Sequence, residues 1–97
     1  MSEATIVVAG NGNLRVNGNI DFTNVVKLRA LGYDFIAKQD SVIFDLTNIT
    51  IGDNSILSLL ISWLRYAKKL RKSLGFVNLP QQLVDMARLC NLDSILI

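Results

Sequence analysis

The sequence contains no histidine, and it has one cysteine among its 97 residues. Without histidine the chain lacks the commonest general base and metal ligand, so it cannot build a Ser-His-Asp or Cys-His site of its own. The spacing of its carboxylates offers neither a metal site nor an acid–base pair. A lone cysteine excludes an internal disulfide and is typical of cytoplasmic proteins. We therefore predict a non-enzymatic protein with no catalytic residue, no metal and no cofactor.

Long hydrophobic runs are also missing, although 51% of the residues are hydrophobic and the mean hydropathy is +0.37. The longest run, residues 56–64, is interrupted by Ser58 and Ser62, whereas a membrane-spanning helix needs roughly 20 mostly apolar residues. The start, MSEATIVVAG, lacks the basic residues and the long apolar segment of a signal peptide. We expect one cytoplasmic domain over residues 1–97, whose apolar residues form a full core, a partner surface, or both.

Positive charge is concentrated in one segment. Half of the ten Lys and Arg residues lie in RYAKKLRK, residues 65–72, which contains no acid, and the formal net charge of the chain is +2. A solvated helix end explains this cluster best, because basic side chains suit the negative end of a helix dipole. No aromatic-rich strand accompanies it, so we expect no nucleic-acid binding. Peripheral contact with anionic lipid stays open.

The first half of the sequence predicts a hairpin, a helix and a strand. Residues 4–10 and 14–20 are rich in β-branched or alternating apolar residues and flank the turn signal NGN. Gly18 indicates a bulge or a close approach of another backbone segment. Residues 21–39 have helical spacing, with Asp21 or Thr23 as the cap and Gly32 as a potential break. The almost wholly apolar segment SVIFDLTNI predicts a strand buried on both faces.

The second half predicts two more helix–strand pairs. A helix from about residue 54 to residue 74 should stop at Gly75. GFVNL is the next strand, Pro80 suits the first turn of the next helix, and DSILI is a last strand. Cys90 is expected to be a small buried residue. The order β-β-α-β-α-β-α-β predicts an α/β fold with a mostly parallel sheet and helices packed on it.

The seam between the central strand and the long helix carries Asp53, Asn54 and Ser55. These small polar residues are a helix cap, because the first helical N–H groups need acceptors. Along the helix, one face is apolar at helical spacing, and a serine stripe lies opposite. A separate apolar flank lies beside the core face. It consists of Leu57, Ile61 and Leu64. The flank is either an extension of the core or a partner surface.

The segments VIFDLTNI, GDNS, ILSLLISWLRYAKKL and GFVNLPQQLVDMARLCNLDSIL together resemble a STAS domain, the domain of anti-sigma factor antagonists and sulfate transporter tails. Residues 41–97 carry most of the resemblance, and VNGNID is similar to the end of the family's second strand. In antagonists of this family, the loop Asp is followed by a Ser or Thr that a kinase phosphorylates. Here Asp53 matches the Asp, but Asn54 follows it and cannot be phosphorylated, so the resemblance implies no phosphoswitch unless Ser55 substitutes.

Within the STAS family the chain is most similar to the small STAS subunit of the Mla phospholipid transport complex. This resemblance implies a non-enzymatic accessory subunit of an ABC-type transporter that serves outer-membrane lipid asymmetry. It would bind the cytoplasmic ATPase subunit at the inner membrane. The first alternative is an anti-sigma factor antagonist that binds a kinase-like anti-sigma factor, and a third, weaker one is a nucleotide or lipid binder. The implied partner-binding residues lie in the loop and the start of the long helix. They are Asp53, Asn54, Ser55, Leu57, Ser58 and Ile61.

Overall fold

The hairpin predicted at the start of the chain forms one edge of a four-stranded sheet. In the computed structural model, which describes residues 4–96, the strands are β1 (Thr5–Val8), β2 (Leu14–Ile20), β3 (Ser41–Ile51) and β4 (Ser73–Val77). They lie in the order β1-β2-β3-β4, with β1 antiparallel to β2 and the other pairings parallel. Gly12 has a φ of 87° in the turn between β1 and β2, a conformation that glycine adopts most readily. The predicted mostly parallel sheet is confirmed.

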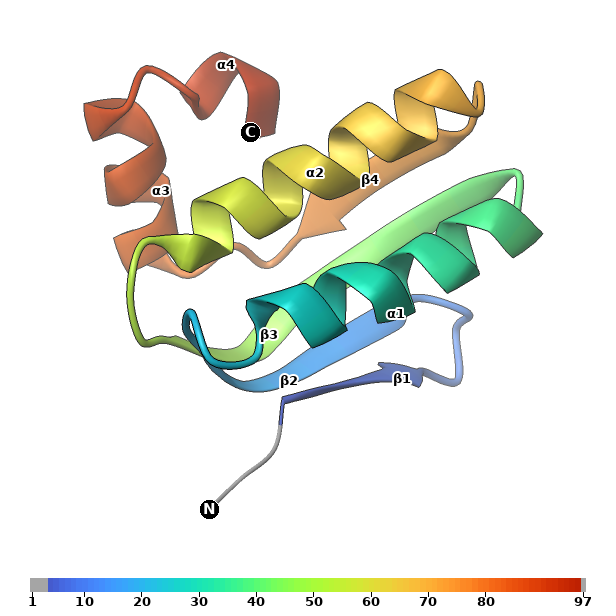
Figure 1. The fold of residues 1–97 in the computed structure, drawn as a ribbon, viewed down its shortest axis with the longest axis horizontal. Helices are drawn as coiled ribbons and strands as arrows, with labels where there is room; N and C mark the ends of the chain where they lie inside the picture. Colours follow the sequence, from blue (N-terminus) through green and yellow to red (C-terminus); the bar gives the residue numbers. More distant parts are fainter. Residues whose placement is uncertain (1–3, 97) are drawn as a thin grey trace.

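Four helices accompany the sheet within the described residues. They are α1 (Val25–Lys38), α2 (Ser55–Lys69), α3 (Gln81–Leu89) and the short α4 (Asp93–Leu96). Figure 1 shows α1 and α2 side by side over one face of the sheet, with α3 and α4 on the far side of α2 from α1. The core therefore lies between the sheet and this single helical layer. None of the helices in residues 4–96 is long and apolar enough to cross a membrane.

The strand β3 is covered on one face only, which corrects the expectation that it is buried on both. Val42, Phe44 and Leu46 are buried on the helical side. Ile43, which points the other way, is 39% exposed. A register shift opposite residues 15–17 of β2 changes which side chains of β3 face the helices. The uncovered face beyond it is occupied by polar pairs, as when the Asn48 side-chain amide donates to the Asn17 side-chain oxygen.

The carboxylate of Asp45 is the polar centre of the sheet face that points away from the helices, where neighbouring side chains cover it. Asp45 is 8% exposed, and its Oδ1 accepts hydrogen bonds from Thr47 N at 3.0 Å and from Asn78 Nδ2 at 3.1 Å. The Nε of Arg15 lies 3.8 Å from its other oxygen. The Thr47 hydroxyl, the Asn78 amide and the Thr47 N–H lower the pKa of Asp45, and Arg15 adds to this effect. This carboxylate therefore joins β2, β3 and the end of β4.

The helix α2 ends earlier than its apolar spacing predicts. It stops at Lys69, and Arg71 follows with a φ of 59° while the Lys72 N–H donates to the carbonyl oxygen of Ala67 over 2.8 Å. Gly75 is not the helix stop, because it lies within β4 and pairs with Ile43 of β3. Residues 73–77 therefore pair with the free edge of β3 as strand β4, although the apolar spacing of Leu74 would also fit a longer α2.

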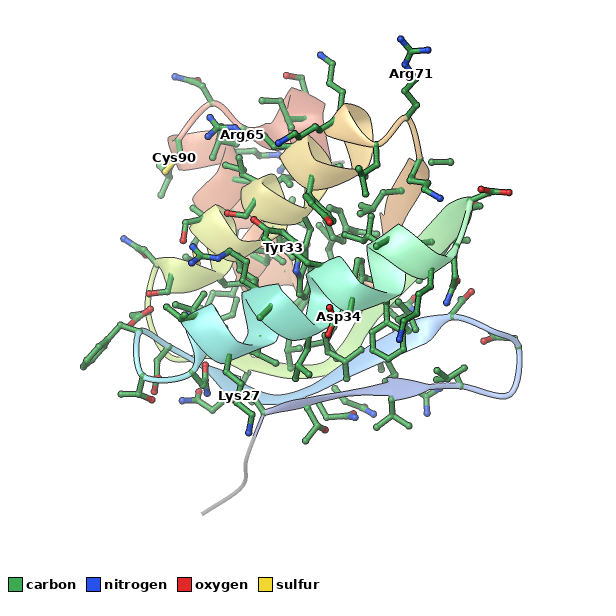
Figure 2. All side chains as sticks on the ribbon, turned by 45° about the vertical axis from the view of Figure 1, so that its right-hand side comes forward. Lys27, Tyr33, Asp34, Arg65, Arg71 and Cys90 are labelled. Carbon is green, nitrogen blue, oxygen red and sulfur yellow. The ribbon has the colours of Figure 1, made fainter. Side chains whose placement is uncertain are left out.

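Two expectations for the end of the chain are also wrong. The segment DSILI does not add a strand: its first four residues form α4, where Leu96 is 5% exposed, and Ile97 lies outside the described residues. The N–H groups of Ile95 and Leu96 donate to the carbonyl oxygen of Leu92, so this backbone is satisfied locally. Cys90 is exposed rather than buried (Figure 2), because it follows the last residue of α3, beyond the turn that packs on the core.

Candidate protein-docking surface

Two loops meet at the carboxyl ends of the parallel strands β2 and β3. The N–H of Gly52, after β3, donates to the carbonyl oxygen of Ile20 at the end of β2 over 2.9 Å. A Cβ at Gly52 would lie 2.9 Å from the Cβ of Asp21, so only glycine allows the loops to approach this closely. The carboxyl ends of parallel strands are where α/β proteins place their binding sites. The loop predicted to bind a partner therefore has a second loop beside it.

Asp53 holds the two loops together and is the residue that caps α2. Its Oδ1 accepts the N–H of Ser55 at 2.8 Å, and its Oδ2 accepts the N–H of Phe22, in the neighbouring loop, at 3.0 Å. The Ser55 hydroxyl and N–H, together with the Phe22 N–H, lower the pKa of this carboxyl. Asp53 therefore stays ionised at neutral pH and fixes the shape of the surface.

Asn54 and Ser58 are exposed, whereas Asp53 is half-buried and both of its carboxylate oxygens accept backbone hydrogen bonds. Asn54 takes the N-cap position of α2, but its side chain makes no capping hydrogen bond. The Ser58 hydroxyl donates to the carbonyl oxygen of Ser55 at 2.9 Å. The cap predicted for the three residues 53–55 is thus supplied by Asp53, and the Asn54 amide remains available to a partner.

The apolar flank of α2 divides between core and surface. Leu57 is 7% exposed and belongs to the core, so little of its side chain is left to contact a partner. Leu64 is half-buried and packs against the same core. Ile61 is half-buried too, yet within residues 4–96 it is not part of the core cluster. The core stripe therefore includes Leu57 in the first turn of α2, and of the three flank residues only Ile61 remains a surface candidate.

The loop between β2 and α1 and the first turn of α1 each contribute an exposed apolar residue that the sequence analysis missed. Phe22, in the loop, is 74% exposed, and its N–H donates to Asp53, which places it next to the α2 loop. Val26, in the first turn of α1, is 62% exposed. Neither falls on the α1 positions that are buried, which are Leu28, Gly32 and Ile36. An apolar side chain off the core spacing, directly after a strand, was the signal available in the sequence. We call Phe22, Val26, Asn54, Ser58 and Ile61 the docking surface.

The comparison with family models decides the identity. The model described as Mlab, STAS domain, matches residues 6–97. The chain belongs to the Mlab family of STAS domains. The resemblance stated from the sequence is confirmed, both for the α/β STAS fold and for its Mla branch. A comparison with curated proteins finds no match.

Solved structures agree with this assignment. A chain of the Acinetobacter MlaFEDB complex, in its ATP-bound Vtrans2 conformation, is 30% identical with a TM-score of 0.82; the match covers 95% of this chain and 96% of that one. The Vtrans1 conformation gives 33% identity, a TM-score of 0.78, and coverage of 94% and 98%. The phosphorylated Bacillus cell fate determinant SpoIIAA is 13% identical over 98% of this chain and 89% of its own, with a TM-score of 0.70, which shows a shared fold alone. This Mlab-family chain is thus an MlaB-like STAS subunit.

Proposed function

We propose that this Mlab-family chain is a non-enzymatic accessory subunit of an MlaFEDB-type ABC phospholipid transporter. The observation that carries the proposal is the similarity of this chain to chains of the Acinetobacter MlaFEDB complex. They are 30% and 33% identical, over nearly the full length of the two aligned chains. As such a subunit it works at the cytoplasmic face of the inner membrane, where it supports the assembly or activity of the transporter and so the asymmetry of the outer membrane.

The docking surface is the part of the chain that we assign to the cytoplasmic ATPase subunit. Phe22 and Val26 supply exposed apolar area, and Asn54 and Ser58 supply polar groups around it. An apolar centre with a polar rim is the usual arrangement of a protein–protein interface. Asp53 contributes indirectly, because its two hydrogen bonds hold both loops in place before the partner arrives.

The second candidate function is that of an anti-sigma factor antagonist, which binds a kinase-like anti-sigma factor. Its support is the fold shared with SpoIIAA at a TM-score of 0.70. Against it stands Asn54, which has no hydroxyl to accept a phosphate at the position that the family resemblance assigns to the phosphoacceptor. The transporter function is less affected by that residue, because docking needs surface complementarity rather than a phosphorylated side chain.

Affinity purification of the tagged protein from its source cell tests the proposal. We expect an ABC-type ATPase and a permease to co-elute with the wild type and to be lost with Phe22→Asp. Val7→Asp is the matched control, because Val7 is 52% exposed on β1 and faces the side of the sheet away from the helices. Co-elution of a GHKL-type kinase instead of the ATPase would favour the antagonist function.

A further inference from the structure

A pocket of about 270 Å³ opens between α1 and the second half of α2, and none of its lining residues belongs to the docking surface. Its lining combines aromatic, hydroxyl and basic side chains, which are Tyr33, Ser62, Arg65, Tyr66 and Lys69. No carboxylate and no aliphatic side chain lines it. The pocket therefore carries positive charge, and the tyrosine rings give it apolar surface beside its polar groups.

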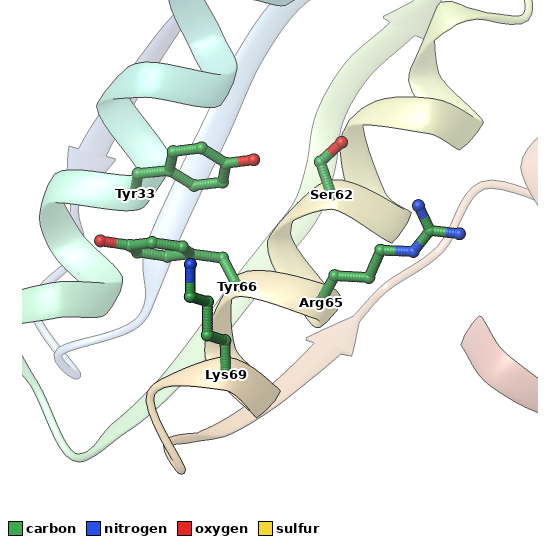
Figure 3. Close-up of a pocket in the computed structure, with 5 residues that line it drawn as sticks. All are labelled: Tyr33, Ser62, Arg65, Tyr66 and Lys69. Atoms are coloured by element: carbon green, nitrogen blue, oxygen red, sulfur yellow. The ribbon is translucent and has the colours of Figure 1, made fainter.

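Two stacked tyrosines form the fixed part of the pocket. The rings of Tyr33 and Tyr66 lie 4.3 Å apart between centroids at an angle of 27°, and both pack against the hydrophobic core. Figure 3 shows their hydroxyl groups pointing in opposite directions, with that of Tyr33 on the side where Ser62 lies. Because the rings are held by each other and by the core, the hydroxyls are placed before any ligand binds.

The two cations of the pocket have no anionic partner among the side chains described for residues 4–92 and 94–96. The ion pairs of these side chains are Arg15 with Asp45 and Lys72 with Asp40, so no carboxylate of this set lies within 4.0 Å of Arg65 or Lys69. Lys69 lies in the last turn of α2, where the helix dipole favours a cation. Arg65 lies a full turn earlier, beyond the reach of that effect. Figure 3 shows its side chain extending outward on the rim, from which a flexible stem can turn inward.

We propose that this pocket binds a phosphate group. A phosphomonoester carries about −1.5 to −2 charges and three acceptor oxygens at neutral pH, which two cations and the Tyr33 hydroxyl complement. The Ser62 hydroxyl donates to the carbonyl oxygen of Ser58 over 2.7 Å, so it can only accept a hydrogen bond from a ligand. The volume is just below the roughly 300–1,000 Å³ typical of ligand pockets, so the ligand is a small phosphate compound or the phosphate of a lipid headgroup. The acyl chains of a lipid would remain outside. The pocket shares no lining residue with the docking surface, and the proposal does not rest on the transporter assignment.

Titration of the isotope-labelled full chain with inorganic phosphate, followed by NMR at constant ionic strength, tests the proposal. We expect saturable shifts of the amides of Tyr33 and of residues 62–69, with sodium acetate giving weaker ones. The double variant Arg65→Gln/Lys69→Gln should weaken binding about tenfold or more, because each removed group donates charge-assisted hydrogen bonds. Tyr33→Phe keeps the ring stacking and should weaken binding by a smaller factor.

The double variant Lys68→Gln/Arg71→Gln is the matched control. It removes the same charge from the last turn of α2 and the turn that follows it, but from side chains that do not line the pocket. It should leave phosphate binding within about twofold of wild type, whereas loss of binding equal to that of the pocket variant would reduce the effect to net charge and overturn the proposal. The absence of saturable shifts in the wild type would overturn it as well.

Two further probes distinguish the sources of the phosphate group. Glycerol 3-phosphate represents a soluble compound, and vesicles of phosphatidylglycerol in phosphatidylcholine represent a headgroup, with pure phosphatidylcholine vesicles as the reference. Binding of glycerol 3-phosphate without vesicle binding identifies a soluble ligand. Vesicle binding that depends on phosphatidylglycerol and is lost in Arg65→Gln/Lys69→Gln identifies a lipid headgroup.

Discussion

Gly32 of α1 lies directly against the indole of Trp63 of α2, so closely that a Cβ on residue 32 would overlap the ring. Trp63 is fully buried, its Nε1 donates to the carbonyl oxygen of Arg29 over 3.2 Å, and its ring stacks on Phe44 at a centroid distance of 4.1 Å. The contact joins α1, α2 and β3 at one point. It also explains why glycine stands in the middle of a helix that it does not break.

Replacement of Gly32 by alanine should destabilise the protein. In an exposed helix this change is stabilising, whereas here we expect a loss of about 1–3 kcal/mol because the added methyl group overpacks the core against Trp63. Urea unfolding measures the loss. Gly10→Ala is the control, since nothing lies within 4 Å of a Cβ at Gly10. A more stable Gly32→Ala variant would contradict the contact.

Acid should weaken the fold through Asp45. Its pKa in the folded state lies below the ordinary value of 3.8, so the unfolded chain binds the proton more tightly. The stabilisation is present above the ordinary pKa and is lost as the pH falls through the lowered one. Asp45→Asn should therefore be less stable than wild type at about pH 7, and the difference should shrink towards about pH 3. Urea midpoints across this range measure it, with Asp34→Asn, at an exposed position on α1, as the control for net charge.

The parts of the fold that depend on local pattern could be predicted from the sequence. The NGN turn and the alternating strands on each side indicated the hairpin, and the apolar strand before GDNS indicated the centre of the sheet. The end of α2 could not be found in this way, because Leu70 and Leu74 continue the helical spacing. Competition from the open edge of β3, which pairs with residues 73–77, decided that boundary. The last apolar run, SILI, is too short for its spacing to distinguish a strand from a helix.

The candidate site was predictable in part. The small polar residues of GDNS marked the loop, and the family resemblance gave it a role. The division of labour within the loop was not visible, since the position of Phe22 next to Asp53 arises only when β2 and β3 pair. Exposure decides the rest: Leu57 and Ile61 have the same chemical character and lie one turn apart, yet only Leu57 belongs to the core.

Alanine substitutions of Asp53 and Asn54 should have different effects, the first mainly on stability and the second mainly on partner binding. Asp53→Ala removes the acceptor for two backbone N–H groups and should lower the urea midpoint measurably. Asn54→Ala removes no capping bond and should change the free energy of unfolding by less than about 0.5 kcal/mol. In pull-downs, Asn54→Ala should weaken capture of the ATPase while the fold stays intact. Unchanged capture by both variants would mean that the loop is only structural.

The protein should not be phosphorylated at the loop in its native host. Asn54 has no hydroxyl to phosphorylate. Ser55 has one, but its N–H donates to the carboxylate of Asp53, and this nearby negative charge would repel a phosphate on Ser55. Intact-mass measurement of the protein purified from its native host should show no stoichiometric phosphate adduct. Such an adduct mapped to Ser55 would contradict this prediction and favour the antagonist function.

A pair of aspartate substitutions on α2 should distinguish surface from core on neighbouring turns. Ile61→Asp should melt close to the wild-type temperature, because Ile61 is only half-buried and its new carboxylate can reach water. It should nevertheless lose the ATPase in pull-downs, since docking would bury an unpaired charge. Leu57→Asp places the same carboxylate in the core and should unfold so small a domain, whose total stability is about 5–15 kcal/mol. Thermal melting followed by circular dichroism, beside the pull-down, separates the outcomes. If Ile61→Asp unfolds the protein, the whole flank is core; if it melts and binds normally, the ATPase docks elsewhere.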